Sequence, residues 1–556
     1  MVHFGNLRTA ISILAAAGTM IGTTAVSAAV SAAPASAQAI YPISLCDKFC
    51  DARNPSLAAG DRIGATDVFG GRHVALHFDD ADNMAWASIS AGKPGDRVWL
   101  DRSFDGGYQW SPYGSKLGAT SIPGGRTGWR TLMYNLDQWS SSRPLEGVVR
   151  ACGQAGSTIS CTPWARTTWN ASNSQRAAAT ALMEFYDIGN AGGVTSSGGT
   201  QLFAHDTVGQ PGYSWWMSAN DLTALIDNIK VADMGSYKPI IGWIYSANRG
   251  AGVAGDAYGD FKNNFVDDTG WWAMAWIDAY QLTGSRAYLA TAEDDANYMN
   301  SFWTSTCGGG VWWSTARNYK NAIANELDLY VNAALHDVIP GDTKYLNQAV
   351  KEWNWFSASG MINGSNLIND GLKIESSGRC VNNGATTWTY NQGVVLEGLA
   401  ELYKATGNAR YLASAEKLAR ASTTSGTLNP VSATAPRGEL REIVSNPSNG
   451  NTPMFKGAYI RGLDVLNAVI AAKSATAGPY SCYLDRQSAV AYLHDRNPAD
   501  QYGYLWAGPW SSTAQNGPDQ PASGQQGSAL FLANAGPAFT SPSSPAVTKA
   551  LHCTGG

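Results

Sequence analysis

The fold is decided by the stretch Ala279-Tyr280-Gln281-Leu282-Thr283-Gly284-Ser285-Arg286-Ala287-Tyr288-Leu289, because the chain repeats it. The same pattern returns as Leu402-Tyr403-Lys404-Ala405-Thr406-Gly407-Asn408-Ala409-Arg410-Tyr411-Leu412, and a weaker copy spans residues 335–346. In each copy a helical pattern ends, a glycine-containing turn reverses the chain, and a Tyr-Leu pair near the next helix start packs back against the hairpin. The repeat therefore predicts a series of helical hairpins.

The spacing of the repeat indicates how many hairpins the chain holds. Its Tyr-Leu pairs begin at residues 288, 345 and 411, so one hairpin takes about sixty residues and six would fill residues 170–537. Such hairpins either stack as an open solenoid or close into a ring. Long loops that carry Trp and Asp favour a closed (α/α)6 barrel with its loops gathered at one end. Apolar residues at three- and four-residue spacing predict helices over residues 175–188, 221–232, 271–282, 286–302, 321–338, 343–358, 390–405, 409–422, 455–472, 487–496 and 524–534.

A different pattern precedes the helices. Between residues 40 and 166, short alternating runs at 72–78, 84–89, 97–101 and 147–152 predict strands of a smaller all-β domain. The fold class is thus mainly α, with a β-rich domain before the barrel. One segment resembles an Asp-box hairpin, namely Ser103-Phe104-Asp105-Gly106-Gly107-Tyr108-Gln109-Trp110. A structural turn held by Asp105 and Trp110 is favoured there over a ligand site. Trp99, Trp110 and Trp129 are candidates for a sugar platform, although buried structural roles are favoured.

The N-terminus has the pattern of an export signal. Arg8 precedes a run of small apolar residues, and Ala37-Gln38-Ala39 is a cleavage site of the A-x-A type. A membrane anchor is disfavoured because Ser, Thr and Gly interrupt the run. We therefore expect a secreted, extracellular protein with no membrane contact after cleavage. The expected parts are a signal peptide (1–39), a β-rich accessory domain (40–168), the catalytic barrel (169–540) and a C-terminal tail (541–556).

Cysteine content and charge narrow the function classes. The eight cysteines of an exported chain predict disulfides, with Cys46–Cys50, Cys152–Cys161 and Cys482–Cys553 suggested by position and Cys307 left to pair with Cys380. Neither a metal nor another cofactor is expected. The net charge of −5 gives no reason to expect nucleic acid. The 21 Trp and 24 Tyr favour a carbohydrate partner, because aromatic faces pack against sugar rings.

Paired carboxylates stand at the start of one predicted helix, in Asn264-Phe265-Val266-Asp267-Asp268-Thr269-Gly270-Trp271-Trp272. Glycosidic hydrolysis needs one group that protonates the leaving oxygen and another that attacks or stabilises the anomeric carbon. Two neighbouring carboxylates in a partly desolvated cleft raise the pKa of one of them, which makes it an acid. Taken alone, the pair is more typical of helix capping.

Three further loop-to-helix junctions shift this balance. They are Gly308–Leu327, Thr387–Gly393 and Met454–Tyr459, and each carries aromatic and polar residues on the inner member of a hairpin. In a closed barrel all four junctions converge on one cleft, where Trp would face sugar rings and Asn, Gln and Lys would bind hydroxyls.

The order of these motifs resembles glycoside hydrolase family 76, the endo-α-1,6-mannanases and related transglycosidases. The resemblance covers about residues 170–536 and does not extend to residues 40–166. It implies an (α/α)6 barrel and a retaining mechanism in which Asp267 is the nucleophile and Asp268 the general acid/base. The candidate substrate-binding residues in these motifs are Trp271, Trp272, Trp312, Trp313, Lys320, Asn321, Asn325, Trp388, Tyr390, Asn391, Gln392, Phe455 and Lys456.

The sequence thus predicts a secreted, monomeric, endo-acting retaining enzyme that cleaves α-1,6 bonds in α-mannan polysaccharide or oligosaccharide. Consecutive residues can hold a retaining pair only outside ideal helical geometry, so we expect the pair at the helix N-cap rather than within the helix. The alternatives are a mannan transglycosidase with the same site, or a non-catalytic protein that binds mannan or cell wall. A uronate-cleaving enzyme is disfavoured, because the motifs supply only Lys320 and Lys456 as cations.

Overall fold

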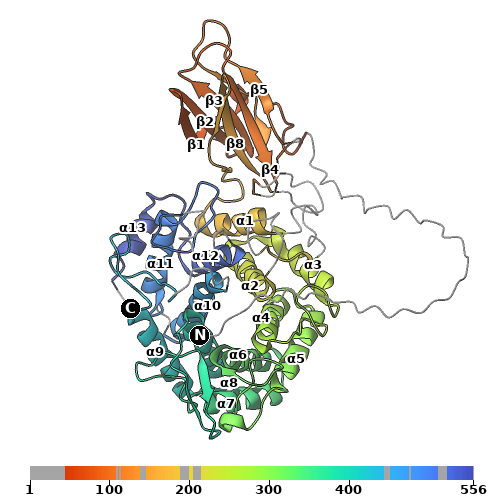
Figure 1. Cartoon of the computed structure of the whole chain (residues 1–556), viewed down its shortest axis with the longest axis vertical. Coiled ribbons are helices and arrows are strands. Elements are labelled where there is room, and N and C mark those ends of the chain that lie inside the picture. The colour runs from red at the N-terminus through yellow and green to blue at the C-terminus, as the bar shows by residue number, and fades with distance from the viewer. Residues whose placement is uncertain are drawn as a thin grey trace, which may run out of the picture. The chain divides into compact units, whose positions relative to one another are not determined.

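The structure is a computed structural model of the whole chain (Figure 1). It describes residues 44–554 apart from 105, 108–109, 112–113, 138–145, 188–199, 205–213, 444–450, 475–476 and 511–521. The predicted signal peptide and Asp105 of the Asp-box motif therefore lie outside the described residues. No helix among the described residues is long and apolar enough to cross a membrane.

The N-terminal region is an all-β domain of two antiparallel sheets, as predicted. Val74, Phe78, Leu100 and Val149 belong to the apolar core that the two sheets share. Since alternate residues of a strand face opposite sides, the alternating runs at 72–78 and 84–89 predicted this burial. One sheet contains β1 (Arg62–Phe69), β2 (Arg72–Asp79), β3 (Met84–Ser90), β6 (Trp129–Arg130) and β7 (Tyr134–Asn135), and the other contains β5 (Leu117–Ser121), β4 (Arg97–Ser103), β8 (Val148–Ala155) and β9 (Thr158–Cys161).

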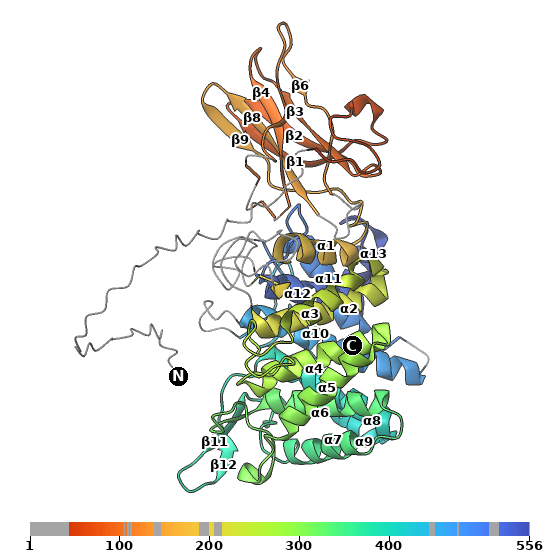
Figure 2. The ribbon, with the colours of Figure 1, turned by 90° about the vertical axis from the view of Figure 1, so that its right-hand side faces the viewer.

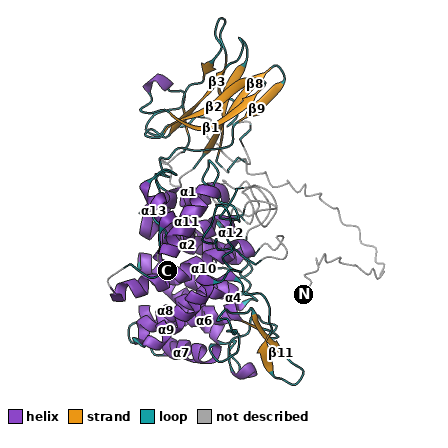
Figure 3. Ribbon diagram, turned by 90° about the vertical axis from the view of Figure 1, so that its left-hand side faces the viewer, coloured by secondary structure: helices purple, strands orange, loops and turns teal. Residues whose placement is uncertain are grey.

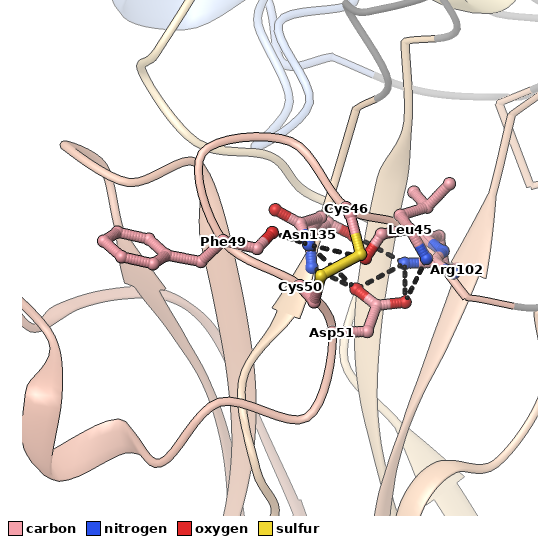
Figure 4. The surroundings of a disulfide bond; sticks show 7 residues. All are labelled: Leu45, Cys46, Phe49, Cys50, Asp51, Arg102 and Asn135. Carbon is pink, nitrogen blue, oxygen red and sulfur yellow. Dashed lines mark hydrogen bonds and ion pairs between the residues drawn. A yellow bond between two sulfur atoms is a disulfide. The ribbon is translucent and has the colours of Figure 1, made fainter.

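A short disulfide loop closes one part of this domain. Cys46 pairs with Cys50, and the following Asp51 accepts hydrogen bonds from Leu45 N at 2.9 Å and Asn135 N at 2.8 Å (Figure 4). The same carboxylate binds Arg102 Nη1 at 3.0 Å, and that arginine is only 1% exposed. A buried guanidinium needs such a partner, so the loop neutralises a charge inside the β-domain.

The rest of the chain is helical, with one small sheet of β10 (Lys320–Asn321), β11 (Gly371–Ile374) and β12 (Cys380–Asn382) (Figures 2 and 3). All eleven predicted helices are present. The described residues form α1 (Ser174–Tyr186), α2 (Trp215–Ala232), α3 (Lys238–Asn248), α4 (Val266–Thr283), α5 (Arg286–Asn300), α6 (Ala322–Val338), α7 (Lys344–Phe356), α8 (Thr389–Thr406), α9 (Ala409–Thr424), α10 (Thr452–Ser474), α11 (Ser481–His494), α12 (Ser523–Ala535) and α13 (Pro545–His552).

The even-numbered helices form a closed inner ring. Each packs against the next, from α2 through α4, α6, α8 and α10 to α12, and α12 packs against α2 (Figure 1). The odd-numbered helices from α1 to α11 cover them from outside, as α5 does for α4 and α9 for α8. Ring closure confirms the (α/α)6 barrel over the open solenoid. At one crossing, Gly462 of α10 lies so close to Gly393 of α8 that a Cβ on Gly462 would meet the Gly393 carbonyl oxygen at 2.0 Å.

The repeated motif forms the predicted hairpin turns. Gly284 ends α4 with φ 72° and Gly407 ends α8 with φ 66°, both in the left-handed region that glycine adopts without strain. Their backbone N–H groups donate to Tyr280 O and Tyr403 O, each at 2.7 Å. The two turns are therefore equivalent in structure as well as in sequence.

Two helices were not predicted, α3 and α13. Helix α3 contains Pro239 and Gly242, residues that usually break a helical pattern. The proline lies in the first turn, where its missing N–H costs nothing, and buried Ile240, Ile241 and Ile244 offset the glycine. Helix α13 packs on α11, beside the Cys482–Cys553 disulfide. All four predicted cysteine pairs are disulfides in the structure.

Candidate active site at the start of helix α4

The carboxylate pair lies in the first turn of α4, two and three residues after the N-cap, whereas the prediction placed it at the N-cap. Phe265 is the N-cap, in extended conformation, so Asp267 and Asp268 are inside the helix rather than at its cap. The reason is a neighbouring loop. Val266 N donates to Trp313 O at 2.8 Å, and Phe265 bridges to Ser314, so the chain is held in strand-like pairing until Phe265. The positive end of the helix dipole faces both carboxylates.

Each carboxylate accepts a side-chain hydrogen bond from a different loop. Trp313 Nε1 donates to Asp267 Oδ2 at 3.0 Å, and Asn263 Nδ2 donates to Asp268 Oδ2 at 2.7 Å. Asp268 N donates to Asp267 Oδ1 at 3.2 Å. Among the described residues, nothing hydrogen-bonds to Oδ1 of Asp268. That oxygen is the one able to carry a transferable proton.

The environment raises the pKa of both groups. Burial is the largest cause for Asp267, the charge of Asp268 adds to it, and the Trp313 hydrogen bond opposes it, so the pKa lies well above the usual range. Burial raises the pKa of Asp268 to about 6, against the Asn263 hydrogen bond. Because the two titrate as a coupled pair, the site retains a proton close to neutral pH. An acid and a carboxylate can therefore coexist there.

Aromatic rings surround the pair on the side of the 313–319 loop. Phe265 lies against Trp313 with ring centroids 5.1 Å apart, and Trp313 meets Tyr319 edge-on at 6.1 Å. The hydroxyl of Tyr319 donates to Asp370 Oδ2, and Asn383 Nδ2 donates to the Tyr319 oxygen at 2.9 Å. Burial raises the pKa of Asp370, and hydrogen bonds from Tyr319 and Trp388 oppose this. Asp370 is thus a third carboxylate of the site, held by two rings.

A second group of rings comes from the inner helices α2, α4, α8 and α10. Trp216 lies 5.8 Å from Trp271 and 5.9 Å from Phe455, measured between ring centroids. Phe455 in turn stacks on Tyr390 at 3.9 Å and meets Trp388 at 5.6 Å. Burial raises the pKa of Tyr390 well above its usual value, and the charges of Asp370 and Asp267 add to it, so this group adjoins the carboxylates. The junctions therefore converge, as the closed barrel required.

Lys320, a predicted substrate-binding residue, is fully buried and bonded to protein. Its amino group donates to the carbonyl oxygens of Thr304 at 3.3 Å, Thr306 at 2.7 Å and Gly310 at 2.7 Å. It also donates to the carbonyl oxygen of Gly309. It also lies 4.8 Å from the centre of the Trp312 ring. Burial lowers its pKa to about 8. Lys320 therefore stabilises the loop that positions Trp313 beside Asp267.

Replacing Lys320 with methionine should therefore affect stability more than substrate affinity. The substitution leaves buried carbonyls without a donor, and we expect the free energy of unfolding to fall by about 2–4 kcal/mol. Urea unfolding would measure this, and KM below the unfolding range would test the role. A large rise in KM without loss of stability would instead indicate direct sugar contact. The exposed Lys417 on α9, changed to methionine, is the matched control.

Four other predicted polar residues are buried and also bind protein groups. Asn321 accepts from Ala324 N at 3.3 Å as the N-cap of α6, and Asn325 accepts from Val311 N at 2.7 Å. Gln392 accepts from Ile368 N at 2.8 Å, while Lys456 donates to Tyr504 O. These side chains fix the loops between hairpins. In the structure they contact protein rather than the ring cluster around the carboxylates.

The remaining predicted residues divide by the groups that they contact. Trp272 packs in the core against Phe261 at 4.8 Å, and Trp312 is buried under Lys320. Asn391 is fully buried, and neither of its amide atoms has a hydrogen-bond partner among the described residues. Trp271, Trp313, Trp388, Tyr390 and Phe455 are the predicted aromatic residues that the structure brings together with the carboxylates.

Four residues of the site were not predicted from the sequence, namely Asn263, Trp216, Tyr319 and Asp370. The first is one residue before the quoted motif, and Tyr319 directly precedes Lys320. Asp370 precedes Gly371 at another junction, and a Cβ on that glycine would meet the Tyr319 hydroxyl at 2.5 Å. In the sequence, the available signal for Asp370 was an acidic residue directly before a glycine at a junction. The described residues hold one cluster of metal-binding residue types, Asp101 with Cys152 and Cys161, and its sulfurs form a disulfide.

Comparisons with known proteins identify the family and the fold of the helical region. A family model described as Glycosyl hydrolase family 76 matches residues 170–543, more than half of the chain. The mannan endo-1,6-alpha-mannosidase DFG5 of Saccharomyces cerevisiae is 29% identical over 216 residues, which cover 36% of this chain and 46% of that protein. The chain spans about half the length of the curated relatives it matches.

Solved structures share the fold of the helical region. The GH76A alpha-1,6-mannanase of Salegentibacter sp. HEL1_6 has a TM-score of 0.54 at 23% identity, covering 65% of this chain and 97% of that one. An inactive variant of that enzyme, with two adjacent aspartates changed to alanine, was solved with alpha-1,6-mannotetrose. It gives a TM-score of 0.53 at 23% identity, with coverage of 65% and 97%.

Proposed function

Because the chain belongs to glycosyl hydrolase family 76, we propose that it is an endo-acting α-1,6-mannanase with Asp267 and Asp268 as its catalytic pair. The observation that carries the proposal is the pair itself. Two adjacent carboxylates with raised pKa values lie at the start of an inner helix, each held by a donor from another loop. Aromatic rings from several hairpins surround them. This is the chemistry that a retaining glycosidase requires.

The hydrogen bonds of the pair support Asp267 as the nucleophile and Asp268 as the acid/base. Both oxygens of Asp267 accept a hydrogen bond, from Trp313 Nε1 and from Asp268 N. These bonds oppose the rise in pKa that burial and the Asp268 charge give Asp267, and by favouring its ionised form they suit a nucleophile that attacks the anomeric carbon. Asp268 has one oxygen that accepts from Asn263 and one that is open, which suits a group that donates a proton to the glycosidic oxygen.

The proposed reaction then has two steps. Asp267 forms a covalent glycosyl-enzyme as Asp268 protonates the leaving oxygen, and water activated by Asp268 hydrolyses that intermediate. Trp313, Tyr390 and Phe455 would pack on mannose rings beside the pair. Asp370 would accept a hydrogen bond from a sugar hydroxyl. The disulfides support export to an oxidising compartment, where a polysaccharide would be reached.

Product analysis on unbranched α-1,6-mannan tests the proposal. Early release of a ladder of oligosaccharides, with retained α configuration at the new reducing end by NMR, is the expected result. Release of mannose alone would contradict endo action, and β products would contradict retention. If longer oligosaccharides accumulate from short ones, the enzyme transfers rather than hydrolyses. Cleavage of another glycan only would remove the substrate assignment and leave the chemistry.

Replacing Trp313 with phenylalanine should shift the pH dependence of catalysis. The indole N–H stabilises ionised Asp267, so its loss raises the pKa of that carboxyl further. Since the nucleophile must be ionised, the acidic limb of the kcat/KM profile should move to higher pH, with about a tenfold loss at its plateau. Trp312→Phe in the same loop is the control. Equal profiles for both variants would exclude the proposed role of Trp313.

A further inference from the structure

The β-domain contains a hollow that has no role in the proposed reaction. It lies between β5 and β6, the edge strands of the two sheets, and has a volume of about 730 Å³. Its lining includes the polar residues Ser88, Thr120 and Asn54, and the Ser88 hydroxyl also binds His77 Nε2 at 2.8 Å. The lining also includes Trp129, Arg126 and Arg130. Carbohydrate-sized ligands fit hollows of this volume.

Trp129 differs from the other tryptophans proposed as sugar platforms. Trp99 is only 3% exposed and donates to Asp101, whereas Trp110 lies between Trp164, at 5.9 Å, and Arg150, at 4.5 Å. Trp129 is 37% exposed. It lies opposite Ile89 on a strand of two residues, so little chain is available to cover it. The exposed part of this indole can pack on a sugar ring.

Two arginines line the same hollow. Arg126 lies over the Trp129 ring, 5.1 Å from its centre, and Arg130 Nη2 reaches Asn54 Oδ1 at 3.4 Å. Neither arginine has a carboxylate partner among the described residues. Other arginines of the domain do, such as Arg72 with Asp96 at 3.0 Å and Arg53 with Asp82 at 2.5 Å. The hollow is therefore locally positive in a chain of net charge −5.

We propose that this hollow binds an anionic glycan, a sugar chain that carries phosphate or carboxylate groups. The face of Trp129 packs on a sugar ring, and the hydroxyl and amide groups bind neutral parts of the sugar. The guanidiniums of Arg126 and Arg130 bind the anionic group, for which their paired donors are suited. The site would attach the protein to a charged polymer independently of Asp267 and Asp268. It does not depend on the proposed mannanase activity.

Affinity electrophoresis of the full chain tests this assignment. The D267N/D268N background prevents cleavage, and the gels contain phosphorylated mannan, the same mannan after enzymatic dephosphorylation, polygalacturonate, or unbranched α-1,6-mannan. We expect retardation by phosphorylated mannan or polygalacturonate to fall at least tenfold in apparent affinity in W129A and in R126Q/R130Q. The two acidic polymers distinguish phosphate from carboxylate as the bound group. R286Q/R410Q, which removes two exposed arginines of α5 and α9, is the charge-matched control.

Several outcomes would overturn the assignment. These are retardation by phosphorylated mannan and by polygalacturonate that is no stronger than retardation by the neutral mannans, equal loss in R286Q/R410Q, or unchanged retardation in W129A and R126Q/R130Q. Near-UV circular dichroism establishes that each variant is folded, and R126Q/R130Q, which changes only exposed side chains, replaces W129A if that variant unfolds. In the otherwise wild-type enzyme, W129A should leave hydrolysis of unbranched α-1,6-mannan unchanged. Failure of hydrolysis itself would concern the barrel and not this site.

Discussion

Replacing Asp267 with alanine should abolish hydrolysis of α-1,6-mannan, with kcat/KM reduced on the order of 10⁴-fold or more. The variant lacks the carboxylate that would form the covalent intermediate, so even a substrate with a reactive leaving group should not restore turnover. Added azide can enter the space of the lost carboxylate and attack the same carbon directly. We therefore expect β-mannosyl azide, identified by NMR, as the rescue product of Asp267→Ala.

Asp268→Ala should behave differently, which makes the two roles separable. Without the acid, mannan cleavage should fall about 10²–10⁴-fold, but an aryl α-mannoside of low leaving-group pKa should still form the intermediate. Azide should then attack the glycosyl-enzyme and give α-mannosyl azide. Loss of the Asp268 charge also lowers the pKa of Asp267, so the acidic limb should move to lower pH. Exchanged azide products would reverse the assignment, and wild-type activity in both variants would end it.

Much of the fold was predictable because its determinants are local. Gly284 and Gly407 mark turns that only the left-handed backbone completes, and the sequence around them repeats. Hairpins that have the same length and turn in the same sense can bury their apolar faces in only a few arrangements. Helix α3 was not predictable by the same means. Its Pro239 and Gly242 suit a helix only in the context of isoleucine side chains that the neighbouring helices cover.

The site was predictable to a smaller extent. Asp267 and Asp268 are adjacent in sequence, so one motif contains both, and ring residues at the junctions were identifiable by position. Lys320 and Gln392 have the polar character of ligand-binding residues, but their partners are backbone groups far along the chain. Periodicity and composition give no information about such partners. Asp370 was missed for the same reason, because its relation to Tyr319 spans about fifty residues.

A buried ion cluster lies inside the ring of inner helices. Arg461 of α10 binds Asp278 of α4 at 2.6 Å, Asp227 of α2 at 3.0 Å, and Glu397 of α8. One guanidinium thus joins four inner helices. Burial raises the pKa of Glu397 to about 8 even though Arg461 opposes the shift. The cluster is consequently close to the limit of what one cation can compensate.

Arg461→Met should lower the free energy of unfolding at pH 7 by about 3–5 kcal/mol, since it leaves buried carboxylates without their cation. The pKa values of Asp278 and Glu397 in the folded variant then rise further above their unfolded values, so the folded state binds more protons than the unfolded state does. Stability should therefore recover as pH falls towards 5, and the deficit against wild type should shrink. Urea unfolding at both pH values measures this. Arg420→Met, an exposed arginine on α9, should change stability by less than about 0.5 kcal/mol. A deficit independent of pH would mean that Arg461 acts through packing, and no deficit would mean that the four helices close the ring without it.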